Sequence, residues 1–183
     1  MAMTKTVWGY IENRDHRVMR RLNSWSAPRW IRFWMLTATR MGDGGLWYGL
    51  GAILLAFGGG RGYSAVGEAG TAAIFGILVF KTLKKLSHRP RPCQFQPHCW
   101  AKVLPPDQFS FPSGHTMTAF SIALVVSYFY PTLQWPLYFL AISIGLSRIV
   151  LGMHFLSDVL AGAVLGSALG IASIVTFAAY GFA

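Results

Sequence analysis

Three short clusters of polar and basic residues interrupt the long apolar runs of this sequence. They comprise Lys84 with Arg91 and Pro92, then Pro112, Ser113, Gly114 and His115, then Ser147 and Arg148 with His154 and Asp158. An imidazole can attack an electrophile or transfer a proton, a carboxylate can orient that imidazole, and cations can hold a charged substrate. Lys84, Arg91 and Arg148 would place three positive charges around one anion, and phosphate suits such a site. The residue types therefore predict phosphoryl chemistry.

His154 and Asp158 are spaced i, i+4 at the predicted start of the last apolar span. On one helix face, the carboxylate can accept a proton from one ring nitrogen, which leaves the other nitrogen as a nucleophile. Asp158 is also the only acid between Asp107 and the C-terminus, and an acid at the edge of an apolar span needs a partner. The spacing predicts a nucleophilic histidine with an orienting aspartate.

Ser113, Gly114 and His115 lead directly into another apolar run. Backbone N–H groups at a helix N-terminus bind anions, and glycine permits close approach. Taken alone, each polar residue has a plainer interpretation: a histidine near a span end is usually a satisfied interfacial residue, and a basic residue there is usually a topology anchor. Their joint occurrence favours one functional site.

Composition indicates the elements that must position these residues. The chain has 183 residues, with 54% hydrophobic and 12% charged, which is too apolar for an ordinary soluble domain. We expect an all-α, polytopic membrane helix bundle with five spans, at about 46–57, 64–83, 115–130, 135–151 and 155–177. Threading the chain through these spans places all three clusters on the same face of the membrane.

Two domains are expected along the chain. Residues 1–43 form a basic, amphipathic interfacial segment, in which Ser26 before Pro28 marks a helix start, so we expect two short helices on the membrane surface. Residues 44–183 form the spanning domain, with a glycine-rich turn at 58–62 and a proline-rich active-site loop at 84–114. Gly162, Gly166 and Gly170 line one helix face, where packing within the chain is favoured over dimerisation. The oligomeric state stays open.

The net charge of +10 raises the question of nucleic acid, but the basic residues lie in the amphipathic segment or beside spans. This distribution favours the lipid bilayer and anionic substrates as partners, not nucleic acid. Cys93 and Cys99 could pair or stay reduced, and His98 beside them gives too few ligands for a metal site. The six acids form no carboxylate cluster, so no metal is expected.

The three clusters together resemble the type 2 phosphatidic acid phosphatase superfamily, which includes lipid phosphate phosphatases and vanadium haloperoxidases. The family pattern is Lys-x6-Arg-Pro, then Pro-Ser-Gly-His, then Ser-Arg-x5-His-x3-Asp. All three motifs are present without a mismatch, at 84–92, 112–115 and 147–158. The resemblance covers roughly residues 81–162.

This resemblance implies a role for each motif residue. His154 would attack phosphorus, Asp158 would orient it, and His115 would protonate the leaving oxygen and later activate water. The residues implied to hold the phosphate oxygens are Lys84, Arg91, Ser113, Gly114 and Arg148. The scheme needs no metal and no cofactor. Arg89 is an alternative phosphate arginine, but the family register favours Arg91 and leaves Arg89 to contact the rest of the headgroup.

The function expected from these observations is hydrolysis of a membrane lipid phosphate through a phosphohistidine. Phosphatidic acid, phosphatidylglycerophosphate and polyprenyl diphosphate are the substrate types considered. A lipid phosphotransferase would use the same residues, and a non-enzymatic scaffold that binds lipid phosphates is a further alternative. The spanning composition disfavours a soluble haloperoxidase.

The resemblance implies a multi-pass protein of a bacterial inner membrane. Many bacterial members begin with a sixth span, which this chain is expected to lack. With five spans, of the 16 basic residues only Arg61 lies opposite the site, so the positive-inside rule favours a cytoplasmic active site. The habit of bacterial lipid phosphatases favours the outer face instead.

Overall fold

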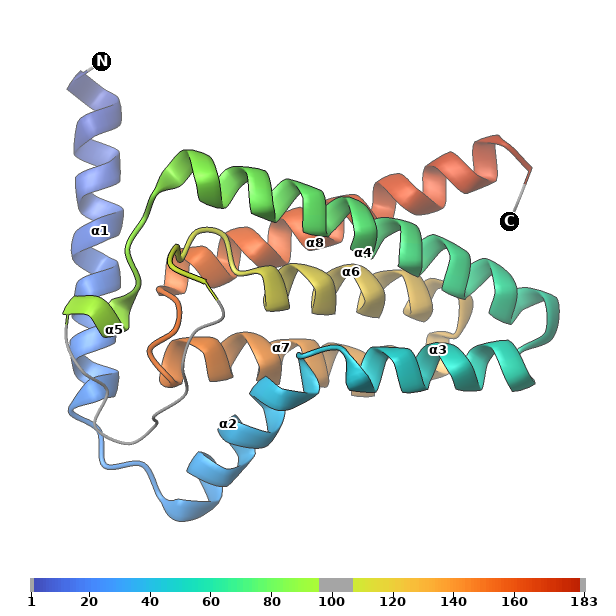
Figure 1. Ribbon diagram of the computed structural model, residues 1–183, viewed down its shortest axis with the longest axis horizontal. Coiled ribbons are helices and arrows are strands. Elements are labelled where there is room, and N and C mark those ends of the chain that lie inside the picture. Colours follow the sequence, from blue (N-terminus) through green and yellow to red (C-terminus); the bar gives the residue numbers. More distant parts are fainter. Residues whose placement is uncertain (1, 96–106, 182–183) are drawn as a thin grey trace.

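The computed structural model describes residues 2–95 and 107–181, and every regular element in these two stretches is a helix (Figure 1). The helices are α1 (Ala2–Asn23), α2 (Arg29–Met41), α3 (Gly45–Phe57), α4 (Gly59–Ser87), α5 (Pro92–Phe95), α6 (Gly114–Phe129), a 3₁₀ turn (Pro131–Leu133), α7 (Gln134–Val150) and α8 (Leu156–Ala179). The all-α prediction is confirmed.

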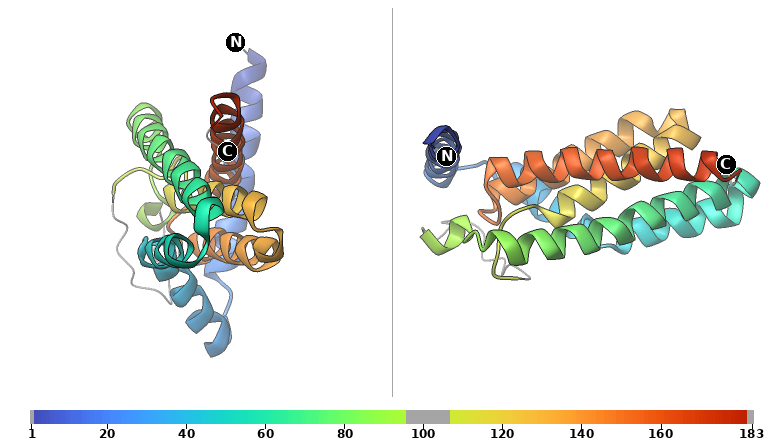
Figure 2. Two further views of the ribbon diagram at one scale, coloured as in Figure 1. Left: turned by 90° about the vertical axis from the view of Figure 1, so that its right-hand side faces the viewer. Right: turned by 90° about the horizontal axis from the view of Figure 1, so that it is seen from above.

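Five of these helices, α3, α4, α6, α7 and α8, run side by side as a bundle (Figure 1). Helix α6 lies at the centre and packs against α4, α7 and α8. Helix α1 crosses one end of the bundle, and a view turned by 90° shows it nearly end-on beside that end (Figure 2). The amphipathic segment is therefore two helices, α1 and α2, with Pro28 capping the start of α2. Both were expected from the sequence.

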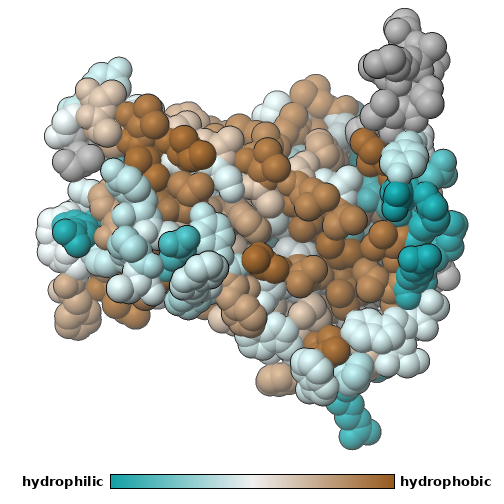
Figure 3. All heavy atoms as spheres, turned by 180° about the vertical axis from the view of Figure 1, so that it is seen from behind, coloured by the Kyte–Doolittle hydropathy of each residue, from teal (hydrophilic) through white to brown (hydrophobic). Residues whose placement is uncertain are grey.

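Small residues fill the interior of the bundle, and large apolar residues cover its outside. Alanines at 65, 69, 72, 119, 123 and 141 are buried in the main cluster. Bulky side chains such as Phe75, Phe139 and Val164 are exposed. Figure 3 shows a band of hydrophobic side chains across the bundle, with hydrophilic ones gathered at the edge that carries α1. Such an arrangement suits a bundle whose solvent is lipid.

Within the described residues, three segments are long and apolar enough to cross a membrane: Gly59–Phe95, Pro131–Val150 and Leu156–Ala179. Helices α3 and α6 are apolar but shorter. The expected count of five spans stays a prediction. Predicted and observed helix boundaries agree within a few residues, apart from the ends of α4.

Helix α4 is longer at both ends than the sequence pattern indicates. The predicted glycine turn shrinks to Gly58, because Gly59 to Gly62 already form the first turn of α4. At the other end the helix continues to Ser87, where His88 adopts a left-handed conformation with φ of 47° and Arg89 precedes a proline. Lys84 therefore lies in the last turn of a helix rather than in a loop.

The glycine face of α8 packs against the backbone of α6. A Cβ atom added at Gly162 would lie 2.6 Å from the carbonyl oxygen of Ser113, and one at Gly166 would lie still closer to that of Met117. One at Gly170 would meet Ser121 and Leu124. The expected packing of these glycines within the chain is confirmed, and it brings the first turns of α6 and α8 together.

Candidate active site

All three motifs meet at the end of the bundle that α1 crosses. Lys84 lies in the last turn of α4 and Arg148 in the last turn of α7, while Ser113 caps the start of α6 and Asp158 lies in the first turn of α8. Because α4 and α7 run toward this end and α6 and α8 run away from it, four helix ends surround one region (Figure 1). The common membrane face expected from threading corresponds to this end.

Arg91 is fully buried and holds several segments together. Its Nη1 donates to the carbonyl oxygen of Met153 at 2.6 Å and lies 3.3 Å from Nε2 of His154. Its Nη2 and Nε donate to Asp107, at 2.6 Å to the carboxylate and 2.9 Å to the carbonyl oxygen. The guanidinium thus faces the ring nitrogen of the predicted nucleophile.

Asp107 also binds Lys84, whose Nζ donates to its second carboxylate oxygen at 2.5 Å. One carboxylate therefore bridges two of the predicted phosphate-binding cations. Burial alone would raise the pKa of Asp107, but hydrogen bonds and charges from Lys84 and Arg91 outweigh it and bring that pKa below its ordinary value. Asp107 stays ionised between these cations near neutral pH.

His154 is buried between α7 and α8, and its Nδ1 lies 3.6 Å from Oδ2 of Asp158. The prediction that both residues lie on one helix face is wrong in detail, because α8 begins only at Leu156. Burial, together with the positive charges of Arg148, Arg91 and Lys84, holds the pKa of His154 well below its ordinary value of 6.5. The imidazole is therefore neutral near pH 7.

Asp158 is held from two sides. Its Oδ2 accepts a hydrogen bond from the backbone N–H of Phe155 at 2.8 Å, and its Oδ1 pairs with Nη1 of Arg89 at 2.6 Å. Arg89 also binds Asp15 of α1 and stacks over the Phe155 ring. Its side chain is only 11% exposed and lies against Asp158 and α1, so its expected contact with a headgroup stays a prediction.

His115, in the first turn of α6, pairs through Nε2 with Asp43 at 2.8 Å. Two residues earlier, the hydroxyl of Ser113 is 2.9 Å from that of Thr116, and the backbone N–H of Ser113 donates to the carbonyl oxygen of Asp158. Gly114 lies against the Phe80 ring, where an added Cβ would be 3.2 Å away. The turn is thus packed tightly at the start of α6.

Arg148 is almost fully buried, but only part of its guanidinium is hydrogen-bonded. Its Nη1 donates to Thr39 of α2 at 2.6 Å, whereas Nε and Nη2 have no hydrogen-bond partner among the described residues. Nδ1 of His154 is likewise without a hydrogen-bond partner in this part of the chain. Buried donors usually have acceptors, so this guanidinium is suited to an anion.

Sequence reasoning missed three acids that join the site: Asp15, Asp43 and Asp107. Each comes from outside the motifs and pairs with Arg89, His115 or the Lys84 and Arg91 pair. With six acids and sixteen basic residues, the composition indicates that such acids have cationic partners, but it does not identify which cations they are.

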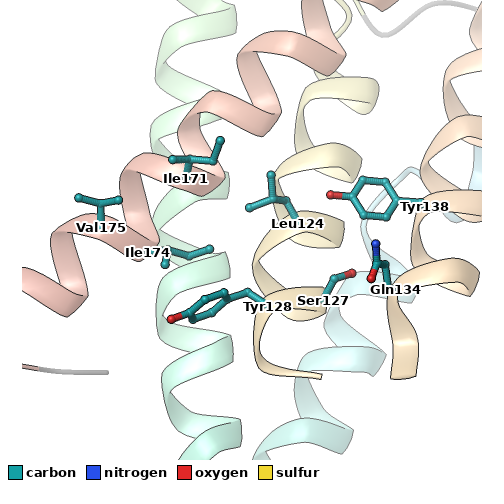
Figure 4. A pocket seen from close by; sticks show the side chains of 8 residues that line it. All are labelled: Leu124, Ser127, Tyr128, Gln134, Tyr138, Ile171, Ile174 and Val175. Carbon is teal, nitrogen blue, oxygen red and sulfur yellow. The ribbon is translucent and has the colours of Figure 1, made fainter. Parts of the chain in front are cut away.

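A groove of about 370 Å³ opens elsewhere, between the distal halves of α6, α7 and α8 (Figure 4). The residues that line it are Leu124, Ser127, Tyr128, Gln134, Tyr138, Ile171, Ile174 and Val175. They include no cation and no histidine, and they lie at the bundle end opposite the motifs. This groove therefore lacks the charged groups and the imidazole that the motifs gather at the other end.

Metal-binding arrangements were sought among the same residues. Within 2–95 and 107–181, no group of three His, Cys, Asp or Glu side chains is placed to hold a metal ion. Cys93 forms no disulfide with a described residue, and Cys99 and His98 lie outside the described stretches. The two alternatives for Cys93 and Cys99, pairing or staying reduced, both stay open.

Comparison with known proteins identifies similar chains. The family model described as the PAP2 superfamily matches residues 65–181. Phosphatidylglycerophosphatase B of Bacillus subtilis is 37% identical over 106 residues, which cover 51% of this chain and 49% of that protein. Undecaprenyl-diphosphatase BcrC of the same organism is 32% identical, over 56% of this chain and 52% of that protein. The chain spans about half the length of these curated relatives.

Among solved structures, the crystal structure of Aquifex aeolicus LpxE is similar to this one. The TM-score is 0.73 at 28% sequence identity, and the match covers 86% of this chain and 93% of that chain. The likeness therefore extends well beyond the motifs.

Proposed function

Because the chain is a multi-pass membrane protein that belongs to the PAP2 superfamily, we propose that it hydrolyses a membrane lipid phosphate through a phosphohistidine at His154. One observation carries this proposal: a neutral, buried imidazole faces Arg91, while the buried Arg148 keeps two nitrogens without an acceptor among the described residues. A nucleophile surrounded by cations suits a phosphoryl group, whose oxygens carry the negative charge.

The ring orientation indicates which nitrogen attacks. Nδ1 faces Asp158 at 3.6 Å, and Nε2 lies on the side of Arg91. Nε2 would form the bond to phosphorus as the bond to the ester oxygen breaks, and Asp158 would stabilise the positive charge on the ring. His115 would give its proton to the departing oxygen. It would then take a proton from water as the water oxygen displaces Nε2 and releases phosphate.

The proposed phosphate-binding residues are Lys84, Arg91, Arg148, Ser113 and Gly114. Three of them are cations, so this chain supplies the positive charge that the reaction needs, and we propose that activity is independent of metal ions. The phosphate would take the position between Lys84 and Arg91 that the Asp107 carboxylate occupies.

A lipid is the proposed source of the phosphate. The site lies at the end of a bundle with an apolar outer surface, so a headgroup can reach the cations while its tails stay in the bilayer. The named relatives act on lipid phosphates of different classes, a phosphatidylglycerophosphate and an undecaprenyl diphosphate. We propose a phosphomonoester or diphosphate lipid as the substrate class.

The test uses purified protein in detergent with ³²P-labelled phosphatidic acid, phosphatidylglycerophosphate and undecaprenyl diphosphate. Brief reaction and quenching should trap an acid-labile, alkali-stable label on the wild-type protein. His154→Gln should lose the label and reduce turnover on the order of a thousandfold. Activity should persist in chelator and fall with vanadate.

His88→Asn is the matched control. His88 is exposed and has a positive φ, which asparagine tolerates, so this variant should keep full activity. Full turnover by His154→Gln would contradict the proposal. Transfer of the label to an added lipid alcohol, without release of phosphate, would identify a phosphotransferase instead.

A further inference from the structure

A single guanidinium connects the N-terminal helix α1 to the proposed catalytic centre. Nη1 of Arg89 pairs with Oδ1 of Asp158 at 2.6 Å, and its Nη2 pairs with Oδ2 of Asp15 at 2.6 Å. The two carboxylates are far apart in the sequence. Both contacts are buried, since the side chain of Asp158 is 0% exposed and that of Asp15 is 3% exposed. Arg89 thus bridges two buried acids from different helices.

Ser157 completes the connection. Its Oγ donates to Oδ2 of Asp15 at 2.5 Å and accepts from Nη1 of Arg89 at 2.7 Å, and its backbone N–H donates to Oδ1 of Asp15 at 3.1 Å. Asp15 therefore binds the residue that directly precedes Asp158 in α8. Both the guanidinium and the first turn of α8 are held by one carboxylate of α1.

The orientation of Asp158 depends on these contacts. The N–H of Phe155 and Nη1 of Arg89 both donate to this carboxylate, and the Ser110 side chain is a further partner. The same carboxylate faces Nδ1 of His154. If Arg89 moves, Oδ1 loses its ion pair, and the carboxyl group can then rotate away from the imidazole.

We propose that Asp15 and Arg89 are positioning residues for the proposed reaction, and that α1 is a working part of the active site. Asp15 holds Arg89, Arg89 holds Asp158, and Asp158 holds His154 in the orientation for attack. The proposal rests on the proposed function. Asp15 lies outside the residues that the family model matches, 65–181, so this role belongs to the N-terminal helix of this chain.

A plainer role for Asp15 would be to dock α1 on the bundle, with α1 serving only to bind lipid or the membrane. The two roles predict different kinetics with a small soluble substrate. Positioning of Asp158 affects kcat for any phosphomonoester, whereas a membrane-binding helix affects only the KM for lipid.

The experiment compares Asp15→Asn with Glu12→Gln, an exposed acid one turn away on α1. Full-length proteins in detergent are assayed with para-nitrophenyl phosphate and with dioleoyl phosphatidic acid. We expect Asp15→Asn to lower kcat for both substrates about tenfold with little change in KM, because the nucleophile is misaligned. Glu12→Gln should match the wild type.

Arg89→Lys tests the bridge itself. Lysine keeps the charge but has one nitrogen, so it cannot bind two carboxylates as the guanidinium does. We expect a similar fall in kcat, and the double variant with Asp15→Asn should be no slower than the slower single variant, because both break one chain of contacts.

If Asp15→Asn does not fold, Ser157→Ala tests the same positioning role. It removes only the hydroxyl between Asp15 and Arg89, and it should lower kcat at an unchanged thermal midpoint. An active wild type with an equally active Asp15→Asn, additive losses in the double variant, or a change in the KM for lipid alone would overturn the inference. A wild type that hydrolyses no phosphate ester would overturn the proposed function, and the inference with it.

Discussion

Asp107 occupies the position that we propose for the substrate phosphate. Its carboxylate bridges Lys84 and Arg91, which are the proposed ligands of the phosphate. A phosphate and this carboxylate would need the same donors, so they compete. The side chain is 39% exposed, and solvent weakens its hold on both cations.

Asp107→Asn should therefore strengthen the binding of phosphate and vanadate. An amide competes poorly with an anion for two cations, and we expect the inhibition constants to fall by about threefold. Product inhibition by inorganic phosphate measures this, with Glu12→Gln as the control. Weaker inhibition in the variant would show that Asp107 supports the anion site instead of competing for it.

The pH dependence of turnover follows from the environment of His154. Burial and the neighbouring cations lower its pKa, so the neutral, nucleophilic form persists as the pH falls through 6.5. At saturating substrate, kcat should stay level across that range and decline only at a more acidic pH. Profiles of kcat measured in buffers of constant ionic strength would test this. A half-maximal point at the ordinary imidazole value would contradict it.

The motif residues of the site could be predicted from the sequence, while their partners could not. Lys84, Arg91, His115, Arg148, His154 and Asp158 follow a spacing that one family shares. Asp15, Asp43 and Thr39 join them only because α1, α2 and the turn after α2 pack against the bundle end. Contacts between distant segments depend on tertiary packing, which no local spacing encodes.

At the scale of the helix, the apolar runs predicted the central part of each bundle helix, but they did not predict where α4 begins and ends. Hydrophobicity stops at about residue 83, but backbone hydrogen bonds continue until His88 turns left-handed. At the other end of α4, the glycines of residues 58–62 were expected to form a turn, because glycine has low helix propensity. Close contact with Leu54 explains Gly62 inside the helix, since an added Cβ would meet that residue's backbone.

The contact between α6 and α8 gives a prediction at this scale. Gly166→Ala would place a Cβ against the carbonyl oxygen of Met117, and forcing the helices apart should cost about 1–3 kcal/mol. Thermal unfolding in detergent should show a lower midpoint. Gly70→Ala is the control, because a Cβ there meets nothing within 4 Å. Equal midpoints for both variants would contradict the close packing.

At the scale of the whole molecule, positive charge is concentrated at the bundle end that carries the site. Among the Lys and Arg residues that the structure describes, Arg61 alone lies at the end opposite the site, near the start of α4. The motif cations are proposed to bind phosphate, but the arginines of α1 and α2 remain after the motif cations are set aside. By the positive-inside rule, we propose that the site and the N-terminus face the cytoplasm.

Thiol labelling in intact cells would test this orientation. In a background with Cys93→Ser and Cys99→Ser, a cysteine replaces either Tyr180, which follows α8, or Glu12 of α1. A membrane-impermeant maleimide should label the first variant and spare the second. The opposite pattern would place the active site on the outer face.

The glycine contact between α6 and α8 also has a consequence for how turnover responds to the membrane. His115 lies in the first turn of α6, and His154 lies two residues before the start of α8. Close backbone packing between the two helices leaves little room for the spacing of these histidines to change. In the proposed reaction, these two histidines would therefore keep their spacing without a hinge between α6 and α8. Gel-to-fluid transitions of the surrounding lipid should alter how fast substrate diffuses to the site, and hence KM, while the rate of the chemical step follows temperature smoothly through the transition.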